Sequence, residues 1–228
     1  MPTHDPTSPS TAPWPVPTQP AEALFTEIYR TNHWGSPESV SGPGSELRQT
    51  KAVRAALASI LARYPIRTIT DAGCGDVNWI RHVDGFDQLD AYVGLDVVAD
   101  LVRRNQERHG SEWVSFRQAD LSRDEIPAGD LVIARDCLVH LTHHEVLAFL
   151  CRVVNSGSSY LLATTYADLA ENRDTADTHW RPLNLQAAPF HLPEPVEHFD
   201  TDFTDDGRHH PGNGLGLWKI DQLSSRTT

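Results

Sequence analysis

The sequence predicts an α/β fold, with a doubly wound, mostly parallel sheet of seven strands that ends in an antiparallel hairpin. Between residues 66 and 165, short β-branched and apolar runs alternate with amphipathic helical segments, which is typical of parallel strands joined through helices. Two more strand-like runs near the C-terminal end are joined by a turn-rich segment. Residues 71–76 place two glycines directly after the first run, where open α/β sheets bind ligands.

Composition limits the classes of function. The 228 residues are enough for one domain with a sizeable core. A formal net charge of −12 argues against a nucleic-acid partner, because basic faces supply most of the affinity for phosphate backbones. Three cysteines without C-x-x-C spacing fit reduced thiols in a cytoplasmic protein. No apolar run approaches the ~20 residues that span a bilayer, so no membrane partner is expected. The sequence leaves the oligomeric state open.

Three regions follow one another along the chain. Residues 1–20 are rich in Pro, Thr and Ser, and we expect a disordered tail because they hold too little apolar surface for a core. Residues 21–65 are expected to form a helical and loop segment that acts as a lid. Residues 66–228 are expected to form the core domain, with a substrate cap around residues 166–195, where the alternating pattern breaks.

Each element is predicted from its local pattern. The expected strands are Thr68–Asp71, Ala91–Asp96, Trp113–Gln118, Leu131–Arg135, Tyr160–Thr165, Val196–Phe203 and Leu215–Ile220. The expected helices are Ala21–Asn32, Glu46–Arg63 with Ser45 as its N-cap, Val98–Arg108, and His143–Val154 with Thr142 as its N-cap. The segment after residue 76 can also open a helix. The last two strands are expected to pair antiparallel at the sheet edge.

The most informative motif is Asp71-Ala72-Gly73-Cys74-Gly75-Asp76. Its glycines allow unusual backbone angles and let a ligand lie directly on the main chain. The third glycine of the dinucleotide fingerprint G-x-G-x-x-G is absent, which disfavours NAD as the ligand. A second landmark is Asp96, which ends the second expected strand 25 positions after Asp71. A carboxylate at that point can accept hydrogen bonds from both hydroxyls of a ribose.

Asp-x-Gly-x-Gly resembles motif I of the class I S-adenosylmethionine (SAM) methyltransferases, which have a Rossmann-like sheet of seven strands. The resemblance implies that Asp120 contacts adenine, and that Arg135 and Asp136 form a wall near the methionine moiety. Many members carry a third glycine where Val77 stands, so contact is expected to shift toward the residues that follow it. The expected cofactor-binding residues are Asp71, Gly73, Gly75, Asn78, Trp79, Asp96, Val97, Asp120, Leu121, Arg135 and Ser45.

Two other segments resemble a narrower bacterial subgroup, which carries W-G, S-x-S-G-x-G-S and W-R-P-L-N-L-Q. Here they read Trp34-Gly35-Ser36, Ser39-Val40-Ser41-Gly42-Pro43-Gly44-Ser45 and Trp180-Arg181-Pro182-Leu183-Asn184-Leu185-Gln186. Some similar enzymes methylate peptidic natural products, including cyclodipeptides. A tryptophan offers a flat apolar wall and an arginine can steer a carbonyl or carboxylate. The expected substrate-binding residues are Tyr29, Trp34, Trp180, Arg181 and Asn184.

A base is needed if the acceptor is a hydroxyl, an amide or an indole. His140 is the first candidate, since an imidazole titrates near neutral pH and this one follows the fourth expected strand. Asp136 is the second candidate, as an orienting group or as the base itself, and Tyr166 is the third. His140 and His144 have a helical metal-ligand spacing, but the sequence fixes no third ligand and no metal is expected.

The sequence therefore predicts a SAM-dependent methyltransferase (EC 2.1.1) that yields S-adenosylhomocysteine (SAH) and acts on an N, O or C nucleophile of a small molecule. A peptidic or aromatic natural product such as a cyclodipeptide is the expected substrate. Three alternatives stay open: a peptide or protein methyltransferase, a non-catalytic SAM- or SAH-binding module, and a doubly wound protein that binds NAD through Asp96.

Overall fold

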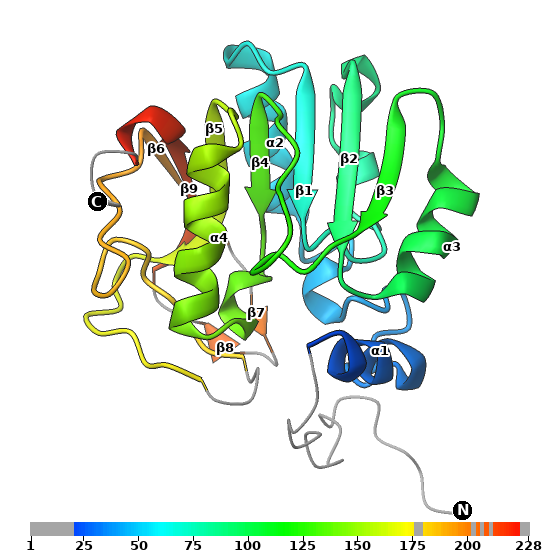
Figure 1. Ribbon diagram of the computed structural model, residues 1–228, viewed down its shortest axis with the longest axis horizontal. Coiled ribbons are helices and arrows are strands. Elements are labelled where there is room, and N and C mark those ends of the chain that lie inside the picture. Colours follow the sequence, from blue (N-terminus) through cyan, green and yellow to red (C-terminus); the bar gives the residue numbers. More distant parts are fainter. Residues whose placement is uncertain (1–20, 176–179, 202–203, 206–207, 210–211, 224–228) are drawn as a thin grey trace, which may run out of the picture.

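The computed structural model describes residues 21–175, 180–201, 204–205, 208–209 and 212–223. Seven strands form one sheet in the order β3-β2-β1-β4-β5-β9-β6, as Figure 1 shows. They are β1 (Thr68–Ala72), β2 (Ala91–Asp96), β3 (Val114–Gln118), β4 (Leu131–Ala134), β5 (Tyr160–Tyr166), β6 (Glu197–Asp200) and β9 (Asn213–Lys219). The first five pair in parallel, and β9 is antiparallel to both β5 and β6. The predicted fold class is confirmed. The expected tail at residues 1–20 lies outside the described residues.

Four α-helices accompany the sheet in the described residues: α1 (Ala21–Thr31), α2 (Lys51–Arg63), α3 (Ala99–His109) and α4 (His143–Asn155). The described residues also form short 3-10 helices: η1 (Pro43–Ser45), η2 (Ile80–His82), η3 (Phe86–Gln88), η4 (Leu138–His140) and η5 (Ile220–Gln222). Two short strands, β7 (Thr204–Asp205) and β8 (Arg208–His209), pair antiparallel in a separate sheet. Among the described residues, no helix is long and apolar enough to cross a membrane.

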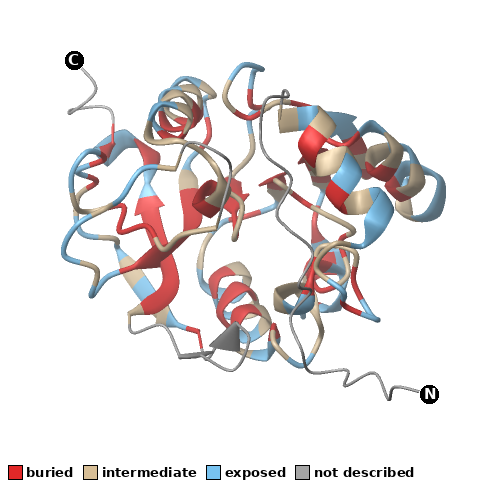
Figure 2. Cartoon of the chain, turned by 90° about the horizontal axis from the view of Figure 1, so that it is seen from below, coloured by how far each residue is buried: buried red, intermediate tan, exposed pale blue. Residues whose placement is uncertain are grey.

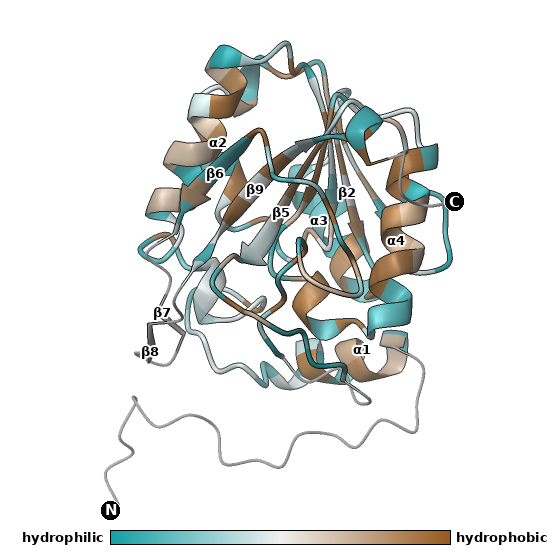
Figure 3. Cartoon of the chain, turned by 90° about the vertical axis from the view of Figure 1, so that its left-hand side faces the viewer, coloured by the Kyte–Doolittle hydropathy of each residue, from teal (hydrophilic) through white to brown (hydrophobic). Residues whose placement is uncertain are grey.

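Two hydrophobic layers hold the sheet between α2 and α4, which lie on opposite sides of it in Figure 3. On β4, Val132 packs on the α4 side with Phe149, whereas the next residue, Ile133, packs on the α2 side with Leu57. Successive side chains of a strand point to opposite faces, so a strand covered on both faces is apolar throughout. Figure 2 shows buried residues mostly toward the middle of the molecule and exposed residues mostly toward its outside.

The N-terminus of α4 is confirmed as predicted. The Oγ1 of Thr142 accepts a hydrogen bond from the backbone N–H of Glu145 at 3.2 Å, and the Glu145 carboxylate accepts one from the backbone N–H of Thr142 at 2.8 Å. This reciprocal capping box satisfies two backbone donors that a helix start otherwise leaves without partners.

Two local predictions were wrong. α2 begins at Lys51 and not at Glu46, so Ser45 is not its N-cap. Ser45 ends η1 instead, and its carbonyl accepts a hydrogen bond from the Asn78 amide. No α-helix opens after the glycine motif either. Val77 has a φ of +51°, in the left-handed region, and the chain then forms only η2 and η3 before β2.

The strand order reverses between β1 and β4, which opens a crevice at the carboxyl ends of these strands. α1 lies across this end of the sheet in Figure 1. The Arg30 guanidinium pairs with Asp100 of α3 at 3.5 Å, and Gln118 of β3 donates to the Glu22 carboxylate at 2.9 Å. These exposed contacts link α1 to α3 and β3.

Candidate functional site

A cavity of about 360 Å³ lies at the carboxyl ends of β1, β2 and β4, beneath α1 and the segment 40–45. Its volume is within the range of small-ligand sites. Fifteen of the residues predicted from the sequence line it: Tyr29, Trp34, Ser45, Asp71, Gly73, Gly75, Trp79, Asp96, Val97, Asp120, Leu121, Arg135, Asp136, His140 and Trp180. The predicted residues that do not line it are Asn78, Tyr166, Arg181 and Asn184.

Close packing by distant residues explains why both motif positions are glycine, and this packing cannot be inferred from the sequence. Gly73 and Gly75 have φ values of +79° and +56°. A Cβ on Gly73 would lie 2.6 Å from the Cβ of Cys137, and one on Gly75 would lie 2.2 Å from the Oγ of Ser41. Both contacts are closer than real Cβ atoms allow, so glycine is required here by neighbouring segments of the chain as well as by the turn.

Asp96 sits at the end of β2 with one backbone donor on each carboxylate oxygen. The N–H of Gly75 donates to Oδ2 at 3.1 Å, and the N–H of Val98 donates to Oδ1 at 2.9 Å. Burial raises the pKa of Asp96, and backbone hydrogen bonds from Val98, Gly75 and Val97 oppose that shift. A carboxylate has about four lone-pair sites, so Asp96 can still accept a hydrogen bond from a ligand in the cavity.

Asp71, at the end of β1, is buried and receives a hydrogen bond of 2.6 Å from the hydroxyl of Tyr92. Loss of solvent raises the pKa of Asp71 to about 6, against the opposing effects of Tyr92 and Arg135. Asp120 follows β3, and its Oδ1 accepts hydrogen bonds from the backbone N–H and the hydroxyl of Ser122 at 2.9 and 2.7 Å. Its carboxylate is thereby held at the cavity wall.

Arg135 and Asp136 form an ion pair of 2.8 Å beyond the end of β4. The Arg135 guanidinium also donates to the carbonyl of Gly44 at 2.8 Å and lies 5.4 Å from the centre of the Trp79 ring. Asp136 has a φ of +52°, and Thr164 holds both its backbone N–H and its Oδ1, at 2.9 and 3.0 Å. A left-handed residue fixed by neighbours in this way is common at functional sites.

Aromatic rings surround His140 at the other part of the cavity. Its imidazole centre lies 5.9 Å from the Phe25 ring and 6.0 Å from the Trp34 ring. Trp180 also lines the cavity, and its ring stands edge-on to Tyr166 at 6.0 Å. Tyr166 itself is buried behind Trp180 and is not on the cavity surface.

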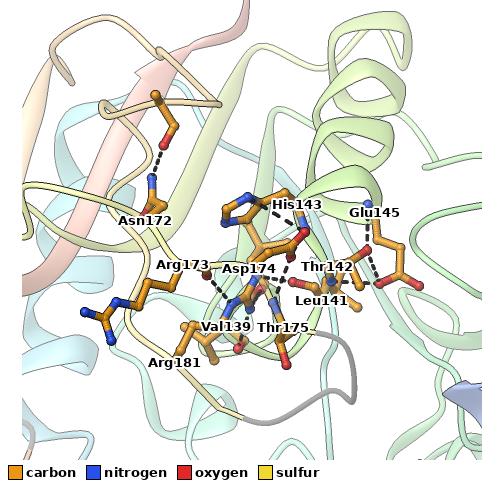
Figure 4. A network of polar contacts seen from close by, with 12 residues as sticks. Val139, Leu141, Thr142, His143, Glu145, Asn172, Arg173, Asp174, Thr175 and Arg181 are labelled. Atoms are coloured by element: carbon orange, nitrogen blue, oxygen red, sulfur yellow. Dashed lines mark hydrogen bonds and ion pairs between the residues drawn. The ribbon is translucent and has the colours of Figure 1, made fainter.

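Arg181 and Asn184, both expected to bind substrate, contact backbone carbonyls outside the cavity lining. The Arg181 guanidinium donates to the carbonyls of Leu138 and Val139, at 3.2 and 2.6 Å, and to that of Leu141. Figure 4 shows this side chain among these groups, beside Asp174 and the start of α4. The Asn184 amide donates to the carbonyls of residues 167 and 169, at 3.2 and 2.9 Å. Arg181 therefore holds the turn that carries His140.

Sequence reasoning missed several residues that shape the site. Asp76 binds Ser39 and Ser41 through its carboxylate, Tyr92 binds Asp71, and Phe25 lines the cavity. The position of Asp76, directly after the second glycine, was a usable signal. Its partners lie 35 and 37 positions away, and no local pattern specifies such a pairing. No group of three or more potential metal ligands occurs among the residues that the structure describes.

We compared the sequence and the fold with those of known proteins. No family model and no curated protein matches the sequence. Among solved structures, the N-methyltransferase NodS from Bradyrhizobium japonicum WM9, in complex with SAH, matches with a TM-score of 0.60 and 11% identity, over 84% of this chain and 97% of that one. The methyltransferase domain of bacterial CtHen1-C matches with a TM-score of 0.56 and 18% identity, over 76% and 98%.

Magnesium protoporphyrin IX methyltransferase (ChlM) from Synechocystis PCC 6803, with bound SAH, matches with a TM-score of 0.54 and 15% identity, over 88% of each chain. The fold is that of the Rossmann-like methyltransferases. In this methyltransferase fold, the cavity lies at the switch point of the sheet, between β1 and β4.

Proposed function

We propose that this protein is a SAM-dependent methyltransferase (EC 2.1.1) that methylates an N, O or C nucleophile of a small molecule. The observation that carries the proposal is the Asp96 carboxylate. It ends β2 on the wall of the cavity, is fixed by the backbone of Gly75 and Val98, and keeps lone pairs for a ribose. Its setting at the switch point of a methyltransferase fold favours this assignment over other nucleoside ligands.

The donor set of the cavity fits such a cofactor. Asp96 would hold the ribose and Asp120 the adenine, while the Gly73–Gly75 backbone would lie against the rest of the cofactor. When bound, SAM supplies an electrophilic methyl carbon on a positively charged sulfur. The cavity is lined by the carboxylates of Asp71, Asp96, Asp120 and Asp136 and by one guanidinium, that of Arg135, and an excess of carboxylates favours a cationic ligand.

His140 would take the proton from an N–H or O–H acceptor. It lines the cavity between Phe25 and Trp34, so a flat acceptor held by these rings would lie beside its imidazole. Asp136 is bound to Arg135, which favours an orienting role over that of a free base. Tyr166 would act only through Trp180, because its ring stands behind that residue.

The aromatic walls favour an uncharged, planar or peptidic acceptor, such as a cyclodipeptide, in a cytoplasmic pathway of natural-product synthesis. Phe25, Tyr29, Trp34 and Trp180 all line the cavity. The carboxylates that face it would repel an anionic acceptor such as a nucleic acid. Segments 21–65 and 166–195 would then serve as lid and substrate cap.

The test is methyl transfer itself. The purified protein is incubated with methyl-labelled SAM and amine-, hydroxyl- and indole-bearing metabolites, cyclic dipeptides early, and mass spectrometry detects label in the acceptor. Transfer to a small molecule supports the proposal. Transfer only to peptides or proteins would assign the macromolecular alternative, and tight SAM binding without any acceptor would assign the non-catalytic module.

A further inference from the structure

Residues 38–45, here called the strap, cross directly over the glycine motif. The Asp76 carboxylate accepts hydrogen bonds from the hydroxyls of Ser39 and Ser41, at 2.9 and 3.2 Å, and from the backbone N–H of Val40 at 3.0 Å. In return, the backbone N–H of Asp76 donates to the Oγ of Ser41 at 2.9 Å. One charged side chain therefore gathers three donors of the strap, and hydrogen bonds to a charged acceptor are among the strong ones.

The other end of the strap is also attached. The Asn78 amide donates to the carbonyl of Ser45 at 3.0 Å and to the Glu38 carboxylate at 2.7 Å. Arg135 donates to the carbonyl of Gly44 at 2.8 Å. Two side chains that the sequence predicted as cofactor ligands are thus bound to the strap, and Arg135 lines the cavity while Asn78 does not.

The strap forms one wall of the cavity, where residues 40–45 all contribute to the lining. Asp76 does not line the cavity, and its carboxylate is turned to the strap. Ser41 lies so close to Gly75 that no side chain fits between them. A ligand resting on the Gly73–Gly75 turn would therefore lie against a strap that donates three hydrogen bonds to Asp76.

We propose that Asp76 is a positioning residue for the cofactor, which holds the strap against the glycine motif through Ser39, Val40 and Ser41. The inference rests on the proposed function. Without Asp76 the strap would have to be ordered by the incoming cofactor, and part of the binding free energy would be lost to that ordering. Affinity for SAM is expected to fall ~10-fold or more, mainly through faster dissociation.

The experiment titrates the full chain with SAM by calorimetry and follows dissociation by stopped flow. It compares wild type, Asp76→Asn, Asp76→Ala, the double variant Ser39→Ala/Ser41→Ala, and the combination of that double variant with Asp76→Ala. Asp84→Ala removes an exposed carboxylate from the same connection and is the matched control. Hydrogen exchange at the amide of Val40, which donates to Asp76, reports the strap directly.

The proposal predicts that Asp76→Ala weakens SAM binding and speeds exchange at Val40. The backbone N–H of Asp76 still donates to the Oγ of Ser41 in this variant, so the serine substitutions are expected to weaken binding further, but by a smaller factor than they do in wild type. Wild-type affinity in Asp76→Ala would overturn it, as would penalties that multiply in the combined variant. Should Asp76→Ala fail to fold, the serine double variant decides: weakened binding together with faster exchange at Val40 supports the proposal, and either unchanged binding or unchanged exchange overturns it. A wild type that does not bind SAM would overturn the proposed function itself, a result distinct from all of these.

Discussion

The hydroxyl of Tyr92 on β2 donates a 2.6 Å hydrogen bond to the carboxylate of Asp71 on the neighbouring strand β1. Both side chains are buried, at 1% and 3% exposure, so the pair joins the two strands beneath the cavity wall. The acid that opens the glycine motif is therefore part of the core as well as part of the cavity lining. Burial raises its pKa to about 6, which makes its charge costly at neutral pH.

Asp71→Asn is expected to flatten the pH dependence of stability. The pKa of Asp71 is raised from 3.8 to about 6, so its contribution to stability is complete below pH 3.8 and is lost as the pH rises through 6. About 3 kcal/mol of unfolding free energy is involved. Asparagine can still accept the Tyr92 hydrogen bond but carries no charge. Urea unfolding of both proteins from pH 4 to 8 measures the difference, and parallel pH profiles would contradict the account.

Thr142→Ala is expected to destabilise the protein by about 1 kcal/mol, because it removes the capping box of α4. Thr142→Ser keeps the hydroxyl and is the matched control. Thermal unfolding should place the serine variant close to wild type and the alanine variant below it. Equal melting temperatures for all three proteins would mean that the cap contributes nothing.

The structural features behind these two predictions differ in whether the sequence alone could reveal them. The capping box is local, with Thr142 and Glu145 three positions apart, and its threonine was recognisable directly. The strands were equally accessible, because buried runs such as Leu131–Ala134 are apolar throughout and turn residues mark their ends. Asp96 could be predicted as a ligand-binding residue because all parallel strands end at the same edge of the sheet, where ligands bind.

The remaining features depend on contacts between distant parts of the chain. Asp71 meets Tyr92 only because β1 and β2 pair in one register, and Asp76 meets Ser39 only after the strap folds back over the turn. Trp180 and Arg181 are adjacent in sequence, yet the first lines the cavity and the second binds carbonyls behind it. Periodicity could not separate such neighbours, since this segment has no regular secondary structure to set which side faces the cavity.

Arg181→Gln is expected to lower kcat about tenfold and to destabilise the protein by about 1–3 kcal/mol, because the carbonyls around His140 lose their donors. Arg181 does not line the cavity, so Kd for SAM should stay unchanged. Arg181→Lys keeps a charge but not the fork of donors, and it should recover stability only in part. Loss of SAM affinity with an unchanged kcat would contradict this positioning role.

His140→Gln is expected to lower kcat ~100-fold or more for a hydroxyl, amide or indole acceptor, while leaving Kd for SAM unchanged. The same substitution should also remove any limb near neutral pH from the profile of kcat against pH. Steady-state rates across pH 5.5 to 9 measure both effects. A variant with wild-type kcat and profile would show that the acceptor needs no base, and the assignment of His140 would be wrong.

The proposed cofactor site is the cavity between β1, β2 and β4, where Asp96 would bind SAM. The most direct measurement is isothermal titration of the purified protein with SAM and, separately, with NAD, in wild type and in Asp96→Ala. We expect micromolar binding of SAM to wild type, no heat with NAD, and no detectable SAM binding to Asp96→Ala. Binding of NAD in place of SAM, or unchanged SAM affinity in Asp96→Ala, would contradict it.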